Sequence, residues 1–429
     1  MPEVNTSSIL RILKNAGVKR LMFIITDIFG KPRGVSFSIK ESLKVLKEGL
    51  CFDGSSLPKY APVHESDILA KPDLSSLYVD PSVHSAWVFC SVVEPSSAKR
   101  RDPRWLLFNA TQALRESRFK VKVGIEVEFF LVKMNGGEVK PVDTCGYFDI
   151  SAPALSVVEE IASKAERAGL GAVKAHHEVA PGQYECVLPA ANPVKACDTF
   201  LLFKELASTT ALSYGLRVTF MPKPFWGVNG SGAHVHLSLY KDGVNVFRFK
   251  GEFSREGFSC IAGLLQMSRS IAALAAPTVN SYKRLIPHHE APTRIAWGYG
   301  NRTTLIRVPL YQGAAERVEF RQPDPLMNPY LTVLTVIKSM LNGLVERLES
   351  PPPVTVSAYE LEGLGETPRH LGEAADEFAN TFNQLGIPTD LAELYLKCKR
   401  EEWKEYLQQC GSWEETWNKV TSWEYSRYL

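Results

Sequence analysis

The stretch Val121–Leu131 constrains the fold most, because its hydrophobicity alternates while it carries two acidic residues. Apolar residues stand at positions 121, 123, 125, 127, 129 and 131, which is the period of a strand with one buried face. Glu126 and Glu128 therefore point to the same face. Two such carboxylates repel each other, so water, cations or a metal must compensate their charge. A solvated strand face and a functional site are both open from this stretch alone.

The totals of the sequence bound the class of protein. A chain of 429 residues is long for a single core, so we expect two domains. Hydrophobic residues make up 45% and charged residues 22%, as in ordinary globular proteins. A net charge of +2 gives no reason to expect nucleic acid or an anionic membrane as a partner. The sequence has no apolar run of about 18 residues and no secretory pattern, so the expected location is cytoplasmic.

The eight cysteines are scattered and form no Cys-x-x-Cys pair. This spacing argues against a structural zinc site and against a disulfide framework. Reduced thiols in a cytosolic protein are the simplest interpretation.

Residues 1–102 are the expected first domain and residues 103–429 the second. In the first domain we predict strands at 21–25 and 86–93 and a helix at 40–49. The turn-forming run Phe52–Ser56 precedes a long loop that reaches Asp80. In the second domain the periodicity predicts helices at the following ranges: 103–118, 154–168, 193–214, 255–276, 328–349, 372–384 and 389–409.

Further strands of the second domain repeat the pattern of one apolar and one chemically reactive face. In 233–239, the side chains of His234, His236 and Ser238 share a face opposite valine and leucine. In 316–321, Arg317, Glu319 and Arg321 do the same. Strands are also expected at 184–188, 218–221 and 304–308, with Glu178, Glu185 and Arg307 in or beside them.

Such strands predict an α+β fold in which helices back an antiparallel sheet with a polar catalytic face. The carboxylates and imidazole expected on that face are Glu126, Glu128, Glu178, Glu185, Glu319 and His234. Oxygen-rich ligands favour Mg²⁺ or Mn²⁺ over zinc. The five carboxylates are more than one ion needs, so we expect more than one metal ion. The nearby arginines are Arg302, Arg307, Arg317 and Arg321. Metals combined with guanidinium groups suit phosphoryl transfer.

Motifs in the same order along the chain resemble those of type I glutamine synthetases. They are Phe52–Ser56, Gly124–Phe130, His176–Gln183, Met221–Pro224 with Asn229–His234, Asn301–Thr303 and Arg321–Leu331. The resemblance implies an N-terminal β-grasp domain and a catalytic sheet domain. It also implies a dodecamer of two stacked hexameric rings, with active sites between neighbouring subunits. The loop with Asp53 and Ser56 would then serve the adjacent subunit's site.

The resemblance further implies the role of each candidate residue. One metal would be bound by Glu128, Glu178 and Glu185, and the other by Glu126, His234 and Glu319. Glutamate would contact Asn229, Gly230, Arg284 and Arg321. ATP would contact His236, Ser238, Arg307 and Arg317, and Arg302 would stabilise the transferring phosphate. The ammonium pocket would contain Asp53, Ser56, Tyr147, Glu178 and Glu290.

The implied reaction has two steps, phosphorylation of the glutamate side chain by ATP and attack of ammonia on the acyl phosphate. Asp53 would take a proton from ammonium, and Glu290 would lie on a mobile flap that closes the site against water. The sequence departs from the family at Ile125 and Val127, which replace prolines, a change also common in relatives that join glutamate to amines. Pro62 replaces the arginine used for glutamine feedback in many members.

Two alternatives to an ammonia ligase therefore stay open. One is a ligase that joins glutamate to an organic amine, such as a polyamine or ethanolamine. The other is a non-catalytic family member, against which the retention of the candidate metal ligands speaks.

Overall fold

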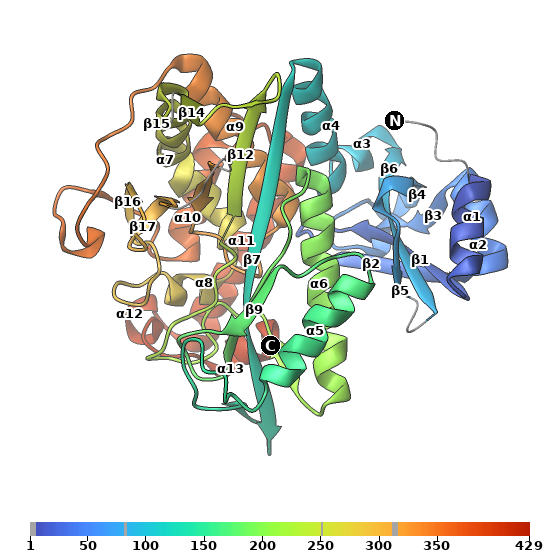
Figure 1. Cartoon of the computed structure of the whole chain (residues 1–429), viewed down its shortest axis with the longest axis horizontal. Helices are drawn as coiled ribbons and strands as arrows, with labels where there is room; N and C mark the ends of the chain where they lie inside the picture. Colours follow the sequence, from blue (N-terminus) through green and yellow to red (C-terminus); the bar gives the residue numbers. More distant parts are fainter. Residues whose placement is uncertain (1–5, 81–83, 250–251, 311–315) are drawn as a thin grey trace.

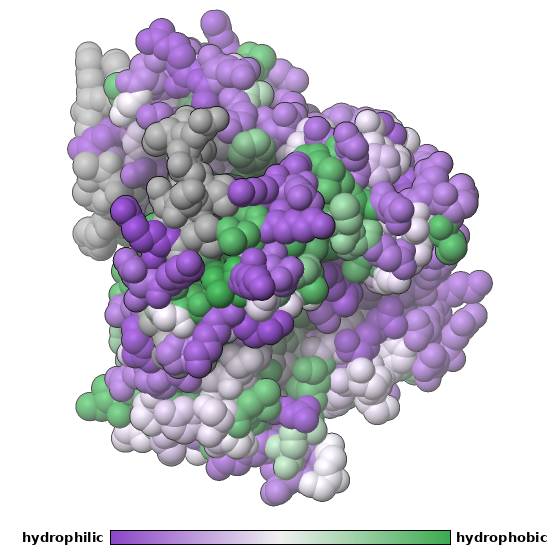
Figure 2. Space-filling model, turned by 90° about the vertical axis from the view of Figure 1, so that its right-hand side faces the viewer, coloured by the Kyte–Doolittle hydropathy of each residue, from purple (hydrophilic) through white to green (hydrophobic). Residues whose placement is uncertain are grey.

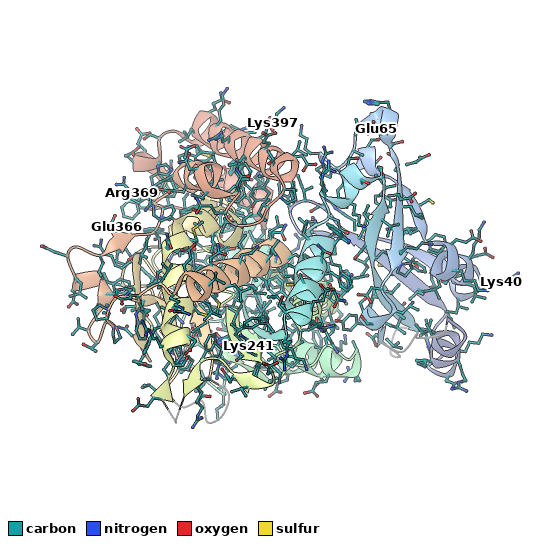
Figure 3. All side chains as sticks on the ribbon, turned by 90° about the horizontal axis from the view of Figure 1, so that it is seen from above. Lys40, Glu65, Lys241, Glu366, Arg369 and Lys397 are labelled. Atoms are coloured by element: carbon teal, nitrogen blue, oxygen red, sulfur yellow. The ribbon has the colours of Figure 1, made fainter. Side chains whose placement is uncertain are left out.

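The computed structural model describes residues 6–80, 84–249, 252–310 and 316–429. These residues form an N-terminal and a C-terminal part that lie side by side, each built around its own sheet (Figure 1). Charged side chains such as Lys40, Glu65 and Lys397 point outward at the edge of the molecule (Figure 3). The face in Figure 2 is mainly hydrophilic, with hydrophobic side chains in separate groups.

The N-terminal sheet has the strand order β2-β1-β6-β4-β3, with β5 added beside β6. Its central pair β1 and β6 is parallel, and its other pairs are antiparallel. Helices α1 (Thr6–Asn15) and α2 (Ile39–Glu48) accompany it. The strands are β1 (Arg20–Thr26), β2 (Pro32–Ser38), β3 (Leu50–Asp53), β4 (Asp67–Pro72), β5 (Tyr78–Asp80) and β6 (Ser85–Glu94). This curled sheet confirms the β-grasp prediction.

The prediction of a long loop between Ser56 and Asp80 is wrong, because this segment contains β4 and β5. Strand β4 pairs with both β3 and β6, and its residues Ile68 and Ala70 are buried. A short strand of this kind is stabilised by its neighbours in the sheet, so its own composition gives a weak signal.

The C-terminal sheet has the strand order β19-β16-β17-β18-β12-β7-β10-β9 across the described residues, while β8 and β11 also pair with β7, and β13 pairs with β12. Its long central strand is β7 (Phe119–Asn135), which runs through the middle of Figure 1. The sheet is mixed, because β16 runs parallel to β17. This differs from the purely antiparallel sheet that we expected.

The bounds of the strands in this part are β8 (Glu138–Pro141), β9 (Lys174–His177), β10 (Gln183–Val187), β11 (Arg217–Thr219), β12 (Val235–Lys241), β13 (Val244–Asn245), β14 (Arg248–Phe249), β15 (Glu252–Phe253), β16 (Arg294–Tyr299), β17 (Thr304–Val308), β18 (Val318–Phe320) and β19 (Gly365–Glu366). Helix α3 (Ser96–Lys99) precedes this part, whose helices are α4 (Pro103–Glu116), α5 (Leu155–Arg167), α6 (Pro193–Ser213), α7 (Arg255–Ala275), α8 (Val279–Arg284), α9 (Pro329–Glu346), α10 (Leu371–Thr381), α11 (Thr389–Cys410), α12 (Trp413–Thr416) and α13 (Ser422–Tyr428). The predicted helices are thus present, with ends shifted by a few residues.

Helices α7 and α9 pack closely at the centre of the C-terminal part. A Cβ atom on Gly263 would lie 2.2 Å from the Ser339 carbonyl oxygen, and one on Gly343 would lie 2.1 Å from that of Ser259. Only glycine permits such an approach of two backbones. Helix α7 is long and apolar enough to cross a membrane, but 83% of its most apolar window is buried inside the protein. It is therefore a core helix.

A buried ionic network joins the two parts. The guanidinium of Arg104, at the start of α4, donates to both carboxylate oxygens of Asp198 on α6 at 2.9 and 2.8 Å. It also donates to Asp73 at 2.8 Å and to the Ser91 hydroxyl at 3.0 Å, both in the N-terminal part. We retain 102/103 as the proposed domain boundary, because Asp102 caps α4 there.

Candidate active site

Strand β7 is the centre of the candidate site, and the register of its neighbours aligns the reactive residues. Val121, Val123, Ile125 and Val127 are buried, so Glu126 and Glu128 lie on the other face. Across the sheet, Glu128 stands opposite Glu185, which stands opposite His176. On the other side of β7, His236 stands opposite Glu319, which stands opposite Arg307.

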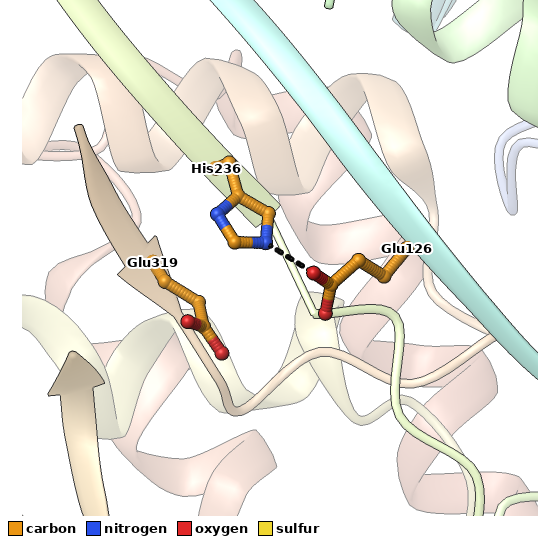
Figure 4. Close-up of side chains that lie close together, drawn as sticks. All are labelled: Glu126, His236 and Glu319. Atoms are coloured by element: carbon orange, nitrogen blue, oxygen red, sulfur yellow. Dashed lines mark ion pairs between the residues drawn. The ribbon is translucent and has the colours of Figure 1, made fainter. Parts of the chain in front are cut away.

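The first cluster contains Glu126, His236 and Glu319, whose ligand atoms all lie within 4.8 Å of one another (Figure 4). The Nε2 atom of His236 is 2.9 Å from Oε1 of Glu126. His234 lies beside this cluster, with its Nδ1 atom 3.1 Å from Glu126, 3.7 Å from Glu128 and 3.8 Å from Glu319. The structure thus brings both histidines to Glu126, whereas the predicted metal set contained His234 alone.

The second cluster contains His176, Glu178 and Glu185. His176 Nε2 is 3.0 Å from Oε1 of Glu178, and its Nδ1 is 3.7 Å from Oε1 of Glu185. Glu128, in the neighbouring strand, accepts hydrogen bonds from the Gly232 amide at 2.7 Å and from the Gln183 side chain at 3.2 Å. Both clusters offer mainly carboxylate oxygens, so the donor set fits Mg²⁺ or Mn²⁺.

The electrostatics of the buried carboxylates differ across the site. Burial and the charges of Glu126 and Glu128 raise the pKa of Glu185 to about 9. Burial, together with Glu178, raises the pKa of Glu128 to about 8. Burial acts in the same direction on Glu319, but Arg321 outweighs it and lowers the pKa of Glu319 to about 2. Ionisation of Glu128 and Glu185 is therefore unfavourable in the metal-free protein, and a bound cation would favour it.

The pKa values of Glu126 and of His234 are shifted as well. Burial opposes the charge on Glu126, yet the imidazole of His236 holds the pKa of that carboxyl well below its usual range. Burial lowers the pKa of His234 to about 4, so this imidazole is neutral at pH 7. A neutral imidazole is the form that binds a metal.

A small cavity of about 20 Å³ is lined by acidic residues on one hand and by arginines on the other. Its lining residues are Glu128, Glu178, Gln183, Asn229, Gly230, His234, Arg284, His289, Glu290, Arg302 and Arg321. Arg284 is fixed by hydrogen bonds to the carbonyl oxygens of Gln322 and Arg321, at 2.9 and 3.1 Å. Arg321 donates to Glu319 and to the Glu290 carbonyl. The four residues predicted to bind glutamate thus share one cavity with two predicted catalytic residues.

The residues predicted to contact ATP lie along β12 and β17 and just before β18. Arg317 donates from Nε to Nδ1 of His236 at 3.3 Å. The Ser238 hydroxyl donates to the Glu316 carbonyl at 3.0 Å. Arg307 forms an ion pair with Glu319. These side chains therefore form one edge of the first cluster.

Three of the five residues predicted for the ammonium pocket lie outside the cavity lining. Asp53 and Ser56 are in the N-terminal part, where Asp53 accepts hydrogen bonds of 2.6 Å from the Ser55 and Ser56 hydroxyls. The Ser55 and Ser56 hydroxyls lower the pKa of Asp53. Tyr147 is 51% exposed and stacks on Phe148 next to His176, near the second cluster.

The sequence analysis assigned no role to His176, Gln183 or His289, which all lie at the site. His176 precedes Glu178 by two residues, and Gln183 shares a face of β10 with Glu185, so alternation could have indicated both. His289 lies in an irregular segment where no periodicity applies. Its position next to Glu290 was the only available signal.

Comparisons with known proteins agree with this geometry. A family model described as "Glutamine synthetase, beta-Grasp domain" matches residues 17–95, and "Glutamine synthetase, catalytic domain" matches residues 100–418. The glutamine synthetase of Pyrococcus horikoshii is 36% identical over 424 residues, covering 96% of each chain. That of Methanocaldococcus jannaschii is 35% identical over 457 aligned residues, covering 100% of this chain and 98% of the relative.

Two solved structures of GmaS, a γ-glutamylmethylamide synthetase, are also similar. The ADP complex has a TM-score of 0.86 at 28% identity, and the ligand-free form 0.85 at 29%. Each alignment covers 97% of this chain and 98% of the other. The fold and the site therefore define an ATP-dependent carbon–nitrogen ligase that acts on glutamate. The chain belongs to the glutamine synthetase family.

Proposed function

We propose that this glutamate ligase uses ammonia as its acceptor and forms glutamine, ADP and phosphate from L-glutamate and ATP. The observation that carries the proposal is the small cavity in which Asn229, Gly230, Arg284 and Arg321 adjoin the candidate metal ligands Glu128, Glu178 and His234. Relatives called glutamine synthetase support ammonia, because they align along 96% or more of this chain at 35–36% identity.

In the first step, a side-chain oxygen of glutamate attacks the terminal phosphorus of ATP, and ADP leaves. We assign the arginine-rich edge formed by Arg307, Arg317, His236 and Ser238 to ATP. Arg302, on the cavity wall, stabilises the transferring phosphate.

The proposed metal ligands are Glu126, Glu128, Glu178, Glu185, His234 and Glu319, and they would hold at least two Mg²⁺ or Mn²⁺ ions. When bound, such ions neutralise negative charge on the phosphate groups. The raised pKa values of Glu128 and Glu185 support this assignment, because they mark carboxyl groups that lack a positive partner. His236 is close enough to Glu126 and Glu319 to serve as a ligand in place of His234.

In the second step, the ammonia nitrogen attacks the carbonyl carbon of γ-glutamyl phosphate, and phosphate leaves. Asp53 accepts the proton that ammonium must lose first, and Glu290 accepts the later one. Ser56, Tyr147 and Glu178 complete the ammonium pocket. Asp53 and Ser56 come from a neighbouring copy of the chain, so the active assembly is a homo-oligomer. We assign it as a dodecamer of two hexameric rings. Its location is the cytoplasm.

A second candidate function is ligation of glutamate to an organic amine. The similarity to the GmaS structures favours it, together with Ile125 and Val127 in place of the usual prolines. The two functions differ only in the acceptor, so the remainder of the site serves both.

Phosphate release from ATP with glutamate and one acceptor at a time distinguishes these functions. The acceptors are ammonium, methylamine, ethanolamine and putrescine, each with Mg²⁺ and with Mn²⁺. We expect the highest kcat/KM with ammonium. Turnover with an amine and none with ammonium would replace the first function by the second, and inactivity throughout would favour a non-catalytic family member.

A further inference from the structure

A buried network joins the last helix of the chain to the segment that precedes Asn229 and Gly230. Glu424 on α13 is fully buried. Its Oε1 atom accepts a hydrogen bond from Nδ2 of Asn280 at 2.7 Å, and its Oε2 atom accepts one from Nζ of Lys283 at 2.5 Å. Asn280 and Lys283 are also fully buried, and both belong to α8, which ends at Arg284. The tail of the chain is therefore bonded directly to the helix that carries Arg284.

Asn280 passes the connection on to the backbone of Lys223. Its Oδ1 atom accepts from the Lys223 amide at 2.7 Å, and its Nδ2 atom donates to the Lys223 carbonyl at 3.0 Å. The next residue along the loop, Pro224, is also hydrogen-bonded, because its carbonyl accepts from the Tyr425 hydroxyl at 2.6 Å. Asn280 on α8 and Tyr425 on α13 thus hydrogen-bond to successive peptide units of the loop.

The loop from Pro222 to Gly232 has little freedom to shift relative to Arg284. The Pro222 carbonyl accepts a hydrogen bond of 2.8 Å from the Ser231 amide, which closes the loop. A Cβ atom on Gly230 would lie 2.2 Å from the Pro222 carbonyl oxygen and 3.1 Å from Cγ of Arg284. The position of Pro222 therefore determines the spacing between Gly230 and Arg284, which line the cavity together.

We propose that Asn280, Glu424 and Tyr425 are positioning residues for glutamate binding, through which the C-terminal helix α13 holds the Pro222–Gly232 loop in its binding geometry. This inference rests on the proposed assignment of the cavity to glutamate. The ATP edge is independent of the network, because the partners of His236 and Ser238 are Glu126, Arg317 and the Glu316 carbonyl. Loss of a network bond should thus weaken glutamate binding and leave ATP binding unchanged.

The test compares Tyr425→Phe with Ser426→Ala in the full-length protein. Both changes remove one hydroxyl from α13, but Ser426 is exposed and its hydroxyl donates to the Trp423 carbonyl within the same helix. Tyr425→Phe should raise KM for glutamate about threefold to tenfold, as expected for one lost hydrogen bond. KM for ATP should stay within about twofold of the wild type in both variants, and Ser426→Ala should bind glutamate like the wild type.

Asn280→Ala removes both bonds to Lys223 and should raise KM for glutamate further than Tyr425→Phe does. If it fails to fold, the Tyr425→Phe result decides, since deletion of a hydroxyl preserves the ring packing. Unchanged KM for glutamate in Tyr425→Phe, or an equal rise of both KM values, overturns the inference while the wild type remains an active ligase. A wild type without glutamate-dependent turnover contradicts the proposed function itself.

Discussion

His236 and Glu126 meet side chain to side chain across two paired strands, with Nε2 2.9 Å from Oε1. Burial alone would lower the pKa of His236, but the Glu126 carboxylate raises it. Glu319 lies on the other side of the same imidazole and contributes in the same direction. One histidine thus links two carboxylates from strands β7 and β18, and a divalent cation in this cluster would compete with the proton of that imidazole.

Glu319→Ala should abolish turnover, because it removes a carboxylate that is 1% exposed from the first cluster. Loss of a side chain that only hydrogen-bonds to a metal ligand already lowers metal affinity or activity by about tenfold to a hundredfold. For loss of a ligand itself we expect kcat/KM to fall by more than about a hundredfold. The variant also leaves Arg321 without its ion-pair partner. The measurement is steady-state phosphate release, with circular dichroism to verify the fold.

A matched control for this variant is Glu366→Gln on β19 of the same sheet, where the carboxylate is exposed and pairs with Arg294. Its activity should equal that of the wild type. Near-normal turnover of Glu319→Ala would remove Glu319 from the proposed metal ligands.

The metal-free protein should lose stability as the pH rises. Burial and neighbouring carboxylates raise the folded-state pKa of Glu128 to about 8 and that of Glu185 to about 9. Between about pH 5 and 8 the folded state then binds more protons than the unfolded state, so the free energy of unfolding falls with pH. The fall should be shallower in Glu185→Gln, because an amide does not titrate. Urea unfolding at several pH values, in a chelator, measures both slopes.

Addition of Mg²⁺ or Mn²⁺ should reverse this trend in the wild type, since a cation that binds only the folded state stabilises it. The melting temperature should rise by several degrees, and by less in Glu185→Gln. Identical slopes in the two proteins, together with identical metal effects, would show that Glu185 lies outside a metal site.

Arg104→Met should destabilise the contact between the two parts of the chain. The change leaves Asp198 buried without its bidentate partner, and such a loss typically costs about 3–5 kcal/mol. We expect a lower midpoint of urea denaturation. The comparison is Arg115→Met on the same helix, whose side chain is exposed and whose loss should change stability by less than about 0.5 kcal/mol.

Each active site should combine Asp53 of one copy of the chain with Glu319 of a neighbouring copy. Asp53→Asn and Glu319→Ala should each be inactive alone. Mixed oligomers, formed by co-expression of the two variants in equal amounts, should regain about one quarter of wild-type activity, the fraction of interfaces in which both contributed residues are intact. Mixed oligomers without activity would indicate that each chain builds its site alone.

Alternation along single strands allowed much of the site to be predicted from the sequence. Glu126 and Glu128 on β7, and His236 and Ser238 on β12, were placed on their faces by period alone. The register between strands was not accessible in this way. It depends on pairing between distant segments, and it is the register that places His236 beside Glu126 and His176 beside Glu185.

Strands that were not predicted from the sequence form because of their neighbours in the folded chain. Strand β4 depends on β3 and β6, and β9 consists of four residues beside β10. The role of the C-terminal helix was hidden for a similar reason, because a buried Glu424 becomes meaningful only when Asn280 and Lys283 are seen to contact it. These relations join residues that no local pattern connects.

The most direct test of the proposed function is the identity of the product formed when ammonium and methylamine compete. The wild-type protein is supplied with glutamate, ATP, Mg²⁺ and equal concentrations of both acceptors, and mass spectrometry measures glutamine and γ-glutamylmethylamide. We predict that glutamine predominates and that its formation matches the phosphate released. Predominant γ-glutamylmethylamide would contradict the account and identify the chain as an amine ligase.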